Sequence, residues 1–229
     1  MFEPTAQSPI VFLSGAGLPS WIWDEVRGRL DVESVVAEYP RRADATLRDY
    51  AEAVLSQVGW PRFTIVAHSI GGVVAAEVVA LAPERVDGVL GVAASVPSVG
   101  TSFLGALPFP QGAVVGLVMR VAGTQPPDKA IRGLCGGVAE EEAARIVADF
   151  APESQRLYRD PVSERELPAR RGYVVTGNDT QFPPALQEKY AAELGGGWRR
   201  DLATAHLPML EDAAGMAAAI DEFAAVSRP

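Results

Sequence analysis

The sequence predicts an α/β fold with a mostly parallel sheet, helices on both faces of the sheet and one inserted helical segment. Short apolar runs alternate with helical patterns along the 229 residues. The runs are apolar at successive positions, as expected of strands that a parallel sheet buries on both faces. The alternation is interrupted once, from about residue 97 to residue 168, where glycine, proline and phenylalanine become frequent.

Most of the apolar runs are followed by a helical pattern. In chain order the expected strands and helices are 10–13 with 21–30, 34–37 with 47–58, 64–67 with 70–82, a further strand at 86–92, 173–176 with 184–194, and 198–202 with 211–226. We therefore expect about six parallel strands. In such sheets the reactive groups gather at the carboxyl ends of the strands.

Length and charge limit the domain count and the partners. The chain has 229 residues, 48% of them hydrophobic, which is enough for one full core plus an inserted segment. We expect residues 1–96 and 169–229 to form the core and residues 97–168 to form an inserted helical cap. The net charge of −9 is spread along the chain without a basic stripe, so nucleic acid is not an expected partner.

The sequence offers no framework for a disulfide or a metal site. Cys135 is the single cysteine, and no His, Cys or carboxylate cluster has ligand spacing, so we expect no cofactor. The first nine residues lack the basic start and apolar core of a secretion signal, and no apolar run reaches the roughly 20 residues that span a bilayer. We expect a cytoplasmic protein with no membrane partner. The oligomeric state is left open.

The segment FTIVAHSIGG, residues 63–72, ends an apolar run abruptly at Ser69. A strand, a sharp turn that carries a serine, and a helix form a nucleophile elbow, in which the positions two before and two after the serine must be small. Here they are Ala67 and Gly71, although glycine is the commoner residue at the first position. The same pattern also fits an ordinary strand, glycine turn and helix.

A serine hydroxyl needs a base to take its proton, and the chain has two histidines. His68 precedes Ser69 in the turn, so we expect its side chain to point away from the serine. His206 lies in a loop between the strand at 198–202 and the last helix, at the same edge of the sheet. We expect His206 to be the base, with an ordinary loop histidine as the alternative.

A histidine base needs an acceptor that fixes its tautomer. Asp179 follows the strand at 173–176. The chain order Ser69, Asp179, His206 is the order expected of a fold in which the nucleophile lies on such an elbow. The loop after 86–92 holds no carboxylate, so Asp179 has little competition, although aspartate also forms turns. The oxyanion donors are expected to be two backbone N–H groups, those of Ala16 and Ile70.

The inserted segment would lie over Ser69 if it covers the carboxyl edge of the sheet. Helical patterns are visible at 113–121 and 140–150. Apolar side chains of the segment could wall a substrate pocket, or they could pack the cap against itself. The candidates are Phe103, Leu104, Leu107, Phe109, Leu117 and Met119.

Three separated stretches resemble the α/β-hydrolase superfamily, in particular its small lidded branch of plant methylesterases and hydroxynitrile lyases. LSGAGLPSWIWDEV resembles the oxyanion strand and first helix of that branch, YVVTGNDTQFPPALQ its acid-bearing segment, and HLPMLEDAAGMAAAI its histidine loop and last helix. The resemblance covers nearly the whole chain and implies an α/β-hydrolase fold with Asp179 as the acid. The antiparallel hairpin that often opens this fold is expected to be missing.

Two departures from that branch shape the expected function. Ser14 stands where the family usually has a histidine, which leaves the backbone donor in place. Leu207 follows His206 where the lyases have a lysine, and Gly15 stands where they have a hydroxyl residue, so cyanohydrin cleavage is disfavoured. We expect an esterase-like serine hydrolase that acts on small or medium apolar esters. The alternatives are carbon–carbon bond hydrolysis, lactone opening or acyl transfer by the same triad, and a non-catalytic protein that binds a small molecule.

Overall fold

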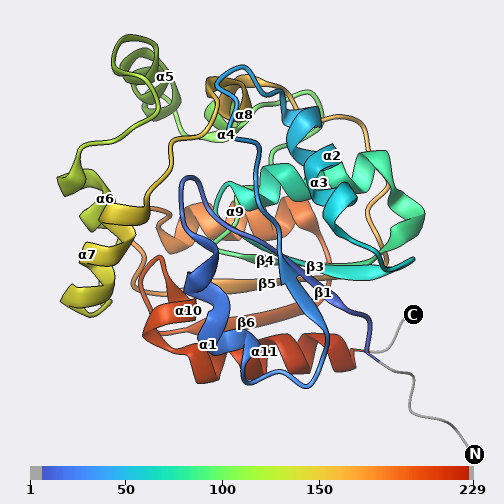
Figure 1. Ribbon diagram of the computed structural model, residues 1–229. Helices are drawn as coiled ribbons and strands as arrows, with labels where there is room; N and C mark the ends of the chain where they lie inside the picture. The colour runs from blue at the N-terminus through green and yellow to red at the C-terminus, as the bar shows by residue number, and fades with distance from the viewer. Residues whose placement is uncertain (1–6, 227–229) are drawn as a thin grey trace, which may run out of the picture.

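A six-stranded, entirely parallel sheet forms the centre of the molecule (Figure 1). The computed structural model describes residues 7–226. The strands are β1 (Ile10–Leu13), β2 (Ser34–Val36), β3 (Phe63–His68), β4 (Val86–Val92), β5 (Arg170–Thr176) and β6 (Trp198–Leu202), in the spatial order β2-β1-β3-β4-β5-β6. The predicted fold class is confirmed. The expectation that the opening hairpin is missing falls partly on residues 1–6, and these lie outside the described residues.

Burial along the strands follows their place in the sheet. Every residue of β1, β3 and β4 is buried, whereas β6 at the edge alternates between partly buried and exposed positions. Strands β1 and β4 flank β3, with Leu13 beside Ala67 and His68 beside Val92 in the register. The carboxyl ends of these three strands therefore meet around Ser69.

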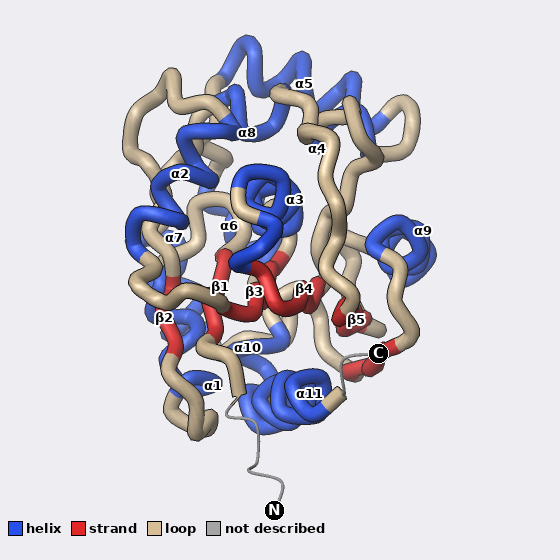
Figure 2. Tube along the Cα trace, turned by 90° about the vertical axis from the view of Figure 1, so that its right-hand side faces the viewer, coloured by secondary structure: helices blue, strands red, loops and turns tan. Residues whose placement is uncertain are grey.

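Helices cover both faces of the sheet (Figure 2). On one face lie α2 (Leu47–Gln57), α3 (Gly71–Leu81) and α9 (Pro184–Leu194), and on the other lie α1 (Asp24–Arg27) and α11 (Ala213–Ala225). The sheet has a separate apolar core on each face, because successive residues of a strand point to opposite faces and pack against different helices. This is the arrangement that the continuous apolar strand pattern predicted.

Two of the predicted helices are divided in the structure. The pattern at 21–30 gives a short 3₁₀ turn (Ser20–Trp23) and then α1, which ends before Gly28. The last helix is preceded by a separate turn, α10 (Pro208–Glu211). The break falls at Asp212, whose side chain accepts a hydrogen bond of 2.8 Å from the Gly215 N–H and so caps α11.

The segment between β4 and β5 holds five helices, α4 (Phe103–Ala106), α5 (Gln111–Ala122), α6 (Asp128–Leu134), α7 (Glu140–Asp149) and α8 (Gln155–Arg159). The sequence pattern predicted α5 and α7 and did not predict α4, α6 and α8. Helix α5 stands away from the sheet in Figure 1, and five apolar side chains on it and on the turn before it are exposed. They are Phe109, Val114, Leu117, Val118 and Val121.

The two ends of this segment are joined at a neck. Gly100 N–H donates to Val162 O at 3.0 Å, and Val162 N–H donates to Thr101 O at 3.1 Å. The Arg165 guanidinium donates to Pro97 O at 2.8 Å. These bonds hold the entry and the exit of the segment side by side.

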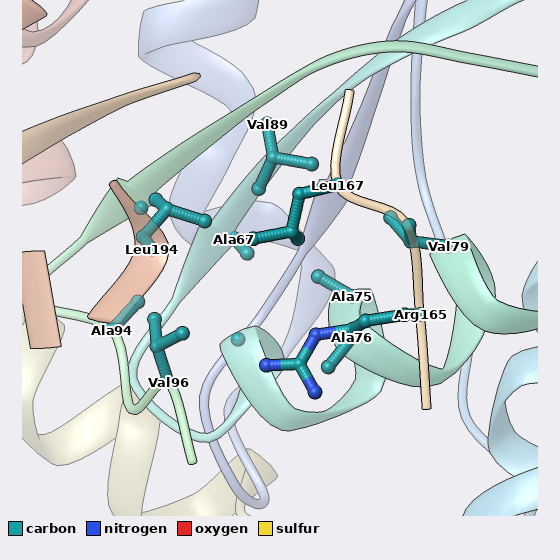
Figure 3. Close-up of a pocket in the computed structure, with 12 residues that line it drawn as sticks. Ala67, Ala75, Ala76, Val79, Val89, Ala94, Val96, Arg165, Leu167 and Leu194 are labelled. Atoms are coloured by element: carbon teal, nitrogen blue, oxygen red, sulfur yellow. The ribbon is translucent and has the colours of Figure 1, made fainter. Parts of the chain in front are cut away.

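Small side chains let α3 lie close to β3 and β4 (Figure 3). Ala67 of β3 and Ala75 and Ala76 of α3 face one another there, and Arg165 lies alongside the two alanines of α3. The cavity between them measures about 10 Å³, about the space that one water molecule needs. This crevice is therefore a packing feature of the elbow and not a substrate pocket.

Among the described residues, no helix is long and apolar enough to cross a membrane.

Candidate active site

Ser69 lies in a strained turn between β3 and α3. Its φ of +54° is in the left-handed region, which residues other than glycine seldom adopt. Three hydrogen bonds hold the turn: Ser69 N–H donates to Val92 O at 3.2 Å, and Ser69 O accepts from Ser95 N–H at 2.8 Å and from Gly72 N–H at 3.2 Å. The neighbouring loop after β4 thus fixes the backbone that presents the Ser69 hydroxyl.

The glycine after the turn is required by close backbone packing. A Cβ at Gly71 would lie 2.5 Å from Leu13 O, and one at Gly72 would lie 2.3 Å from Ser95 O. Both distances are well inside van der Waals contact. The small residues of the motif therefore let the start of α3 sit between the ends of β1 and β4.

The structure brings Ser69, His206 and Asp179 into one hydrogen-bonded chain. His206 Nε2 lies 3.1 Å from Ser69 Oγ, and His206 Nδ1 lies 2.7 Å from Asp179 Oδ2. Because a carboxylate only accepts, Nδ1 carries a proton, and in the neutral form of the ring the lone pair of Nε2 then faces the serine. This tautomer can remove the hydroxyl proton.

Asp179 is buried, and its loop supplies donors to both carboxylate oxygens. Oδ1 accepts from the N–H groups of Gln181 and Phe182 at 2.8 and 2.9 Å, and the Thr176 hydroxyl donates to Oδ2 at 3.1 Å. Burial raises the pKa of Asp179, but the hydrogen bond and charge of His206 and the two backbone donors outweigh burial, so the pKa is below its ordinary value. Asp179 is therefore ionised where His206 needs an acceptor.

His68 supports the backbone of His206 and makes no described side-chain hydrogen bond to Ser69. Its Nε2–H donates to His206 O at 2.8 Å. The ring is fully buried and lies 4.8 Å from the His206 ring, centroid to centroid. Burial, aided by the nearby charge of His206, lowers the pKa of His68 to about 3, so His68 is neutral.

The loop after β1 carries the predicted donor Ala16. Ser14, which stands in the usual place of a histidine, is held from two sides: Trp23 Nε1–H donates to its hydroxyl at 3.1 Å, and Tyr39 OH donates to its carbonyl at 3.0 Å. Among the described backbone hydrogen bonds, none uses the N–H of Ala16 or of Ile70. The two N–H groups therefore have no backbone hydrogen-bond partner among the described residues.

Five of the six residues predicted to wall the pocket divide into three groups. Phe103 stacks on Phe182 with a centroid separation of 6.3 Å, and Phe182 in turn lies 5.5 Å from the His206 ring. Leu107 is buried in the core, and Met119 is partly buried against it. Leu104 and Leu117 line a groove of about 420 Å³ on the inserted segment.

Phe109 departs from the expectation. It is 92% exposed and walls no enclosed space in this structure, because it lies on the short turn between α4 and α5 that faces solvent.

Two residues near the site were not predicted. Gln187 is fully buried. Its side-chain oxygen accepts from Thr176 N–H at 3.0 Å, and its side-chain NH₂ group donates to Phe182 O at 2.6 Å. The two bonds tie together the two ends of the Asp179 loop. Glu153 is buried against the loop that carries Ala16. Both contacts depend on side-chain direction, and no motif or spacing in the sequence indicates them. Among residues 7–226, no group of three or more His, Cys, Asp or Glu side chains could hold a metal ion.

The chain belongs to the alpha/beta hydrolase family, whose model matches residues 10–219. It is therefore an α/β-hydrolase enzyme, as the resemblance of its motifs implied. No curated protein matches the chain at a significant level.

Solved structures of this fold cover almost the whole chain. An extracellular alpha/beta-hydrolase from a Paenibacillus species, which shares homology with tobacco salicylic acid binding protein 2, is 17% identical, with 94% of this chain and 98% of that chain covered and a TM-score of 0.78. A methylesterase from Arabidopsis is 17% identical (94% and 98% covered, TM-score 0.73), and a pyrethroid hydrolase from Sphingobium faniae is 16% identical (96% and 98% covered, TM-score 0.70). At these identities the likeness concerns the fold.

Proposed function

We propose that the protein is a serine hydrolase that cleaves carboxylic esters of small or medium apolar acyl or alcohol groups. The observation that carries this proposal is the hydrogen-bonded chain from Asp179 through His206 to Ser69, with separations of 2.7 and 3.1 Å. Membership of the alpha/beta hydrolase family supports it. The esterases and hydrolases among the similar structures agree with it.

In the proposed reaction Ser69 Oγ attacks the ester carbonyl carbon while its proton passes to His206 Nε2. His206 then gives this proton to the departing alcohol, which leaves an acyl group on Ser69. A water molecule, deprotonated by the same nitrogen, attacks the acyl carbon and releases the acid. The N–H groups of Ala16 and Ile70 hold the negative oxygen of both tetrahedral intermediates.

We further propose that residues 97–168 form a cap that receives the apolar part of the ester. Between Asp87 and Asp128 the only charged side chain in the sequence is Arg120. Phe103 reaches the His206 ring through Phe182. Leu104 lines a groove of the same segment, together with Leu117, Arg120 and Arg159. An apolar group of the ester suits the aromatic side chains of Phe103 and Phe182 near His206.

A fluorophosphonate probe tests the nucleophile. We expect the probe to label the wild type and to leave Ser69→Ala unlabelled, and hydrolysis of p-nitrophenyl esters to fall at least about a thousandfold in that variant. Ser95→Ala is the matched control, because it removes a buried hydroxyl beside the elbow and keeps the Ser95 N–H that binds Ser69 O. Equal labelling of wild type and Ser69→Ala would contradict the proposed nucleophile.

A further inference from the structure

Residues 150–154 of the inserted segment enclose Gly17, the residue after the proposed oxyanion donor Ala16. Ala151 N–H donates to Gly17 O at 3.1 Å, and Gly17 N–H donates to Glu153 Oε1 at 3.2 Å. The Phe150 ring fills the space that a side chain at position 17 would need, since a Cβ there would lie 2.3 Å from a ring carbon. Both polar groups of the Gly17 backbone are thus bound by a segment more than 130 residues away in the sequence.

These contacts fix the orientation of a peptide group in the oxyanion loop. Leu18 N–H donates to Gly15 O at 3.2 Å, so residues 15–18 form a turn, and Gly17 has a φ of +68°. A positive φ at the third residue is the mark of a type II turn, in which the central peptide is turned over relative to a type I turn. That peptide joins Ala16 to Gly17. The N–H of this peptide is that of Gly17, and it donates to Glu153. Glu153 therefore favours the orientation of the peptide seen in the structure.

The Glu153 carboxylate is itself held in place. It is 6% exposed, and Tyr50 OH donates to its Oε2 at 2.8 Å while accepting from Ser154 N–H at 2.9 Å. The Thr124 hydroxyl, by contrast, donates to the main-chain oxygen of Glu153 at 2.5 Å and not to its carboxylate. Burial raises the pKa of Glu153 above its ordinary value, and the donors on both carboxylate oxygens offset part of this effect. A buried carboxylate is costly to the fold unless its hydrogen bonds compensate, and one that serves packing alone could be replaced by an apolar residue of the same size.

We propose that Glu153 is a positioning residue for the oxyanion hole: through the Gly17 N–H it holds the turn that directs the Ala16 N–H toward the substrate carbonyl. This inference rests on the proposed function. It makes the inserted segment part of the machinery that stabilises the tetrahedral intermediate, in addition to any role in binding the substrate.

Two nearly isosteric substitutions separate this role from packing. Glu153→Met keeps the side-chain volume and removes the acceptor. We expect kcat to fall about tenfold to a hundredfold, with KM changed less than about twofold. The reason is that the Ala16 N–H, which would be misplaced, acts mainly in the transition state. The second-order rate of labelling by the fluorophosphonate should fall in parallel. Glu153→Gln keeps an oxygen for Gly17 N–H and should remain within about threefold of wild type.

Two further variants complete the test. Thr124→Val loses the bond to Glu153 O and leaves the carboxylate in place, so we expect wild-type kcat. Ala151→Pro removes the donor to Gly17 O, and we expect a smaller loss of kcat than in Glu153→Met. If Glu153→Met does not fold, as judged by circular dichroism, Glu153→Asp decides the question, because its shorter side chain moves the acceptor away from Gly17 N–H and should lower kcat and the labelling rate.

The outcomes distinguish the two proposals. A wild type that neither hydrolyses esters nor reacts with the probe refutes the serine hydrolase itself. A wild type that does both, together with folded Glu153→Met and Ala151→Pro variants of unchanged kcat and labelling rate, overturns the role of Glu153. A Thr124→Val variant as impaired as Glu153→Met also overturns it, since general support of the segment would then explain the loss.

Discussion

At the scale of single residues, His68 joins the turn that carries Ser69 to the loop of His206, the proposed base. Its Nε2–H supports the carbonyl of His206, while its Nδ1 is buried without a hydrogen-bond partner among the described residues. A protonated ring would need a second acceptor, and burial has removed water from that side. The neutral ring is thus part of the folded state, and the acid stability of the protein depends on it.

We predict that this dependence is measurable. Since the pKa of His68 is lowered to about 3, the unfolded chain binds a proton at this position below about pH 6.5 that the folded protein does not. The stabilisation is fully present above the unfolded pKa and is lost as pH falls from about 6.5 toward 3. Between pH 8 and pH 4 this amounts to about 3 kcal/mol.

Urea unfolding at both pH values checks the prediction against His68→Gln, whose side-chain amide can still donate to His206 O but does not titrate. The free energy of unfolding of His68→Gln should change with pH by about 3 kcal/mol less than that of wild type. Equal pH dependence in the two proteins would assign the acid sensitivity to other groups.

At the scale of elements, the packing of α3 on the sheet sets the geometry of the elbow. We predict that Gly72→Ala destabilises the protein by about 1 to 3 kcal/mol, because the added Cβ would lie 2.3 Å from Ser95 O. Helix propensity alone predicts the opposite, a gain of about 1 kcal/mol for alanine within a helix. The sign of the change in unfolding free energy therefore identifies the dominant effect.

Gly59→Ala is the control for this substitution. A Cβ at position 59 meets nothing within 4 Å, so we expect a change below about 0.5 kcal/mol or a small gain. A Gly72→Ala protein as stable as Gly59→Ala would mean that α3 moves away from β4 at little cost.

The elements themselves were largely predictable from the sequence, because each depends on local pattern. All six strands and the helices α2, α3 and α9 lie within a few residues of their predicted ranges, since continuous apolar runs and the Pro and Gly residues around them mark their limits. The short helices α6 and α8 have too few periodic residues to be recognised. Glu153 was not predictable, because its role depends on a contact with Gly17 that only the path of the inserted segment creates.

At the scale of the whole molecule, stability is unevenly distributed between the sheet and the inserted segment. Gly112 and Gly116 are the buried residues of α5, and both lack a side chain, whereas every residue of β3 and β4 is buried. Helices with little buried apolar surface open locally at low free energy.

We therefore predict that backbone amides of α5 exchange with deuterium much faster than those of β3 and β4. Hydrogen exchange followed by mass spectrometry checks this, with α9 as the internal comparison because it packs Leu186, Tyr190 and Leu194 into the core. Protection of α5 equal to that of α9 would mean that its exposed apolar face is covered in solution.

The neck at residues 97–101 and 162–165 is a suitable place to exchange the inserted segment, and with it substrate preference, between enzymes of this fold. Because the two ends already meet, a foreign segment of different length could be spliced there with little added loop-closure entropy. Its length would matter less than its last residues. A transplanted segment without an equivalent of 150–154 would bring a new pocket and leave Gly17 unheld, so a successful chimera must carry over Glu153 along with the new lining.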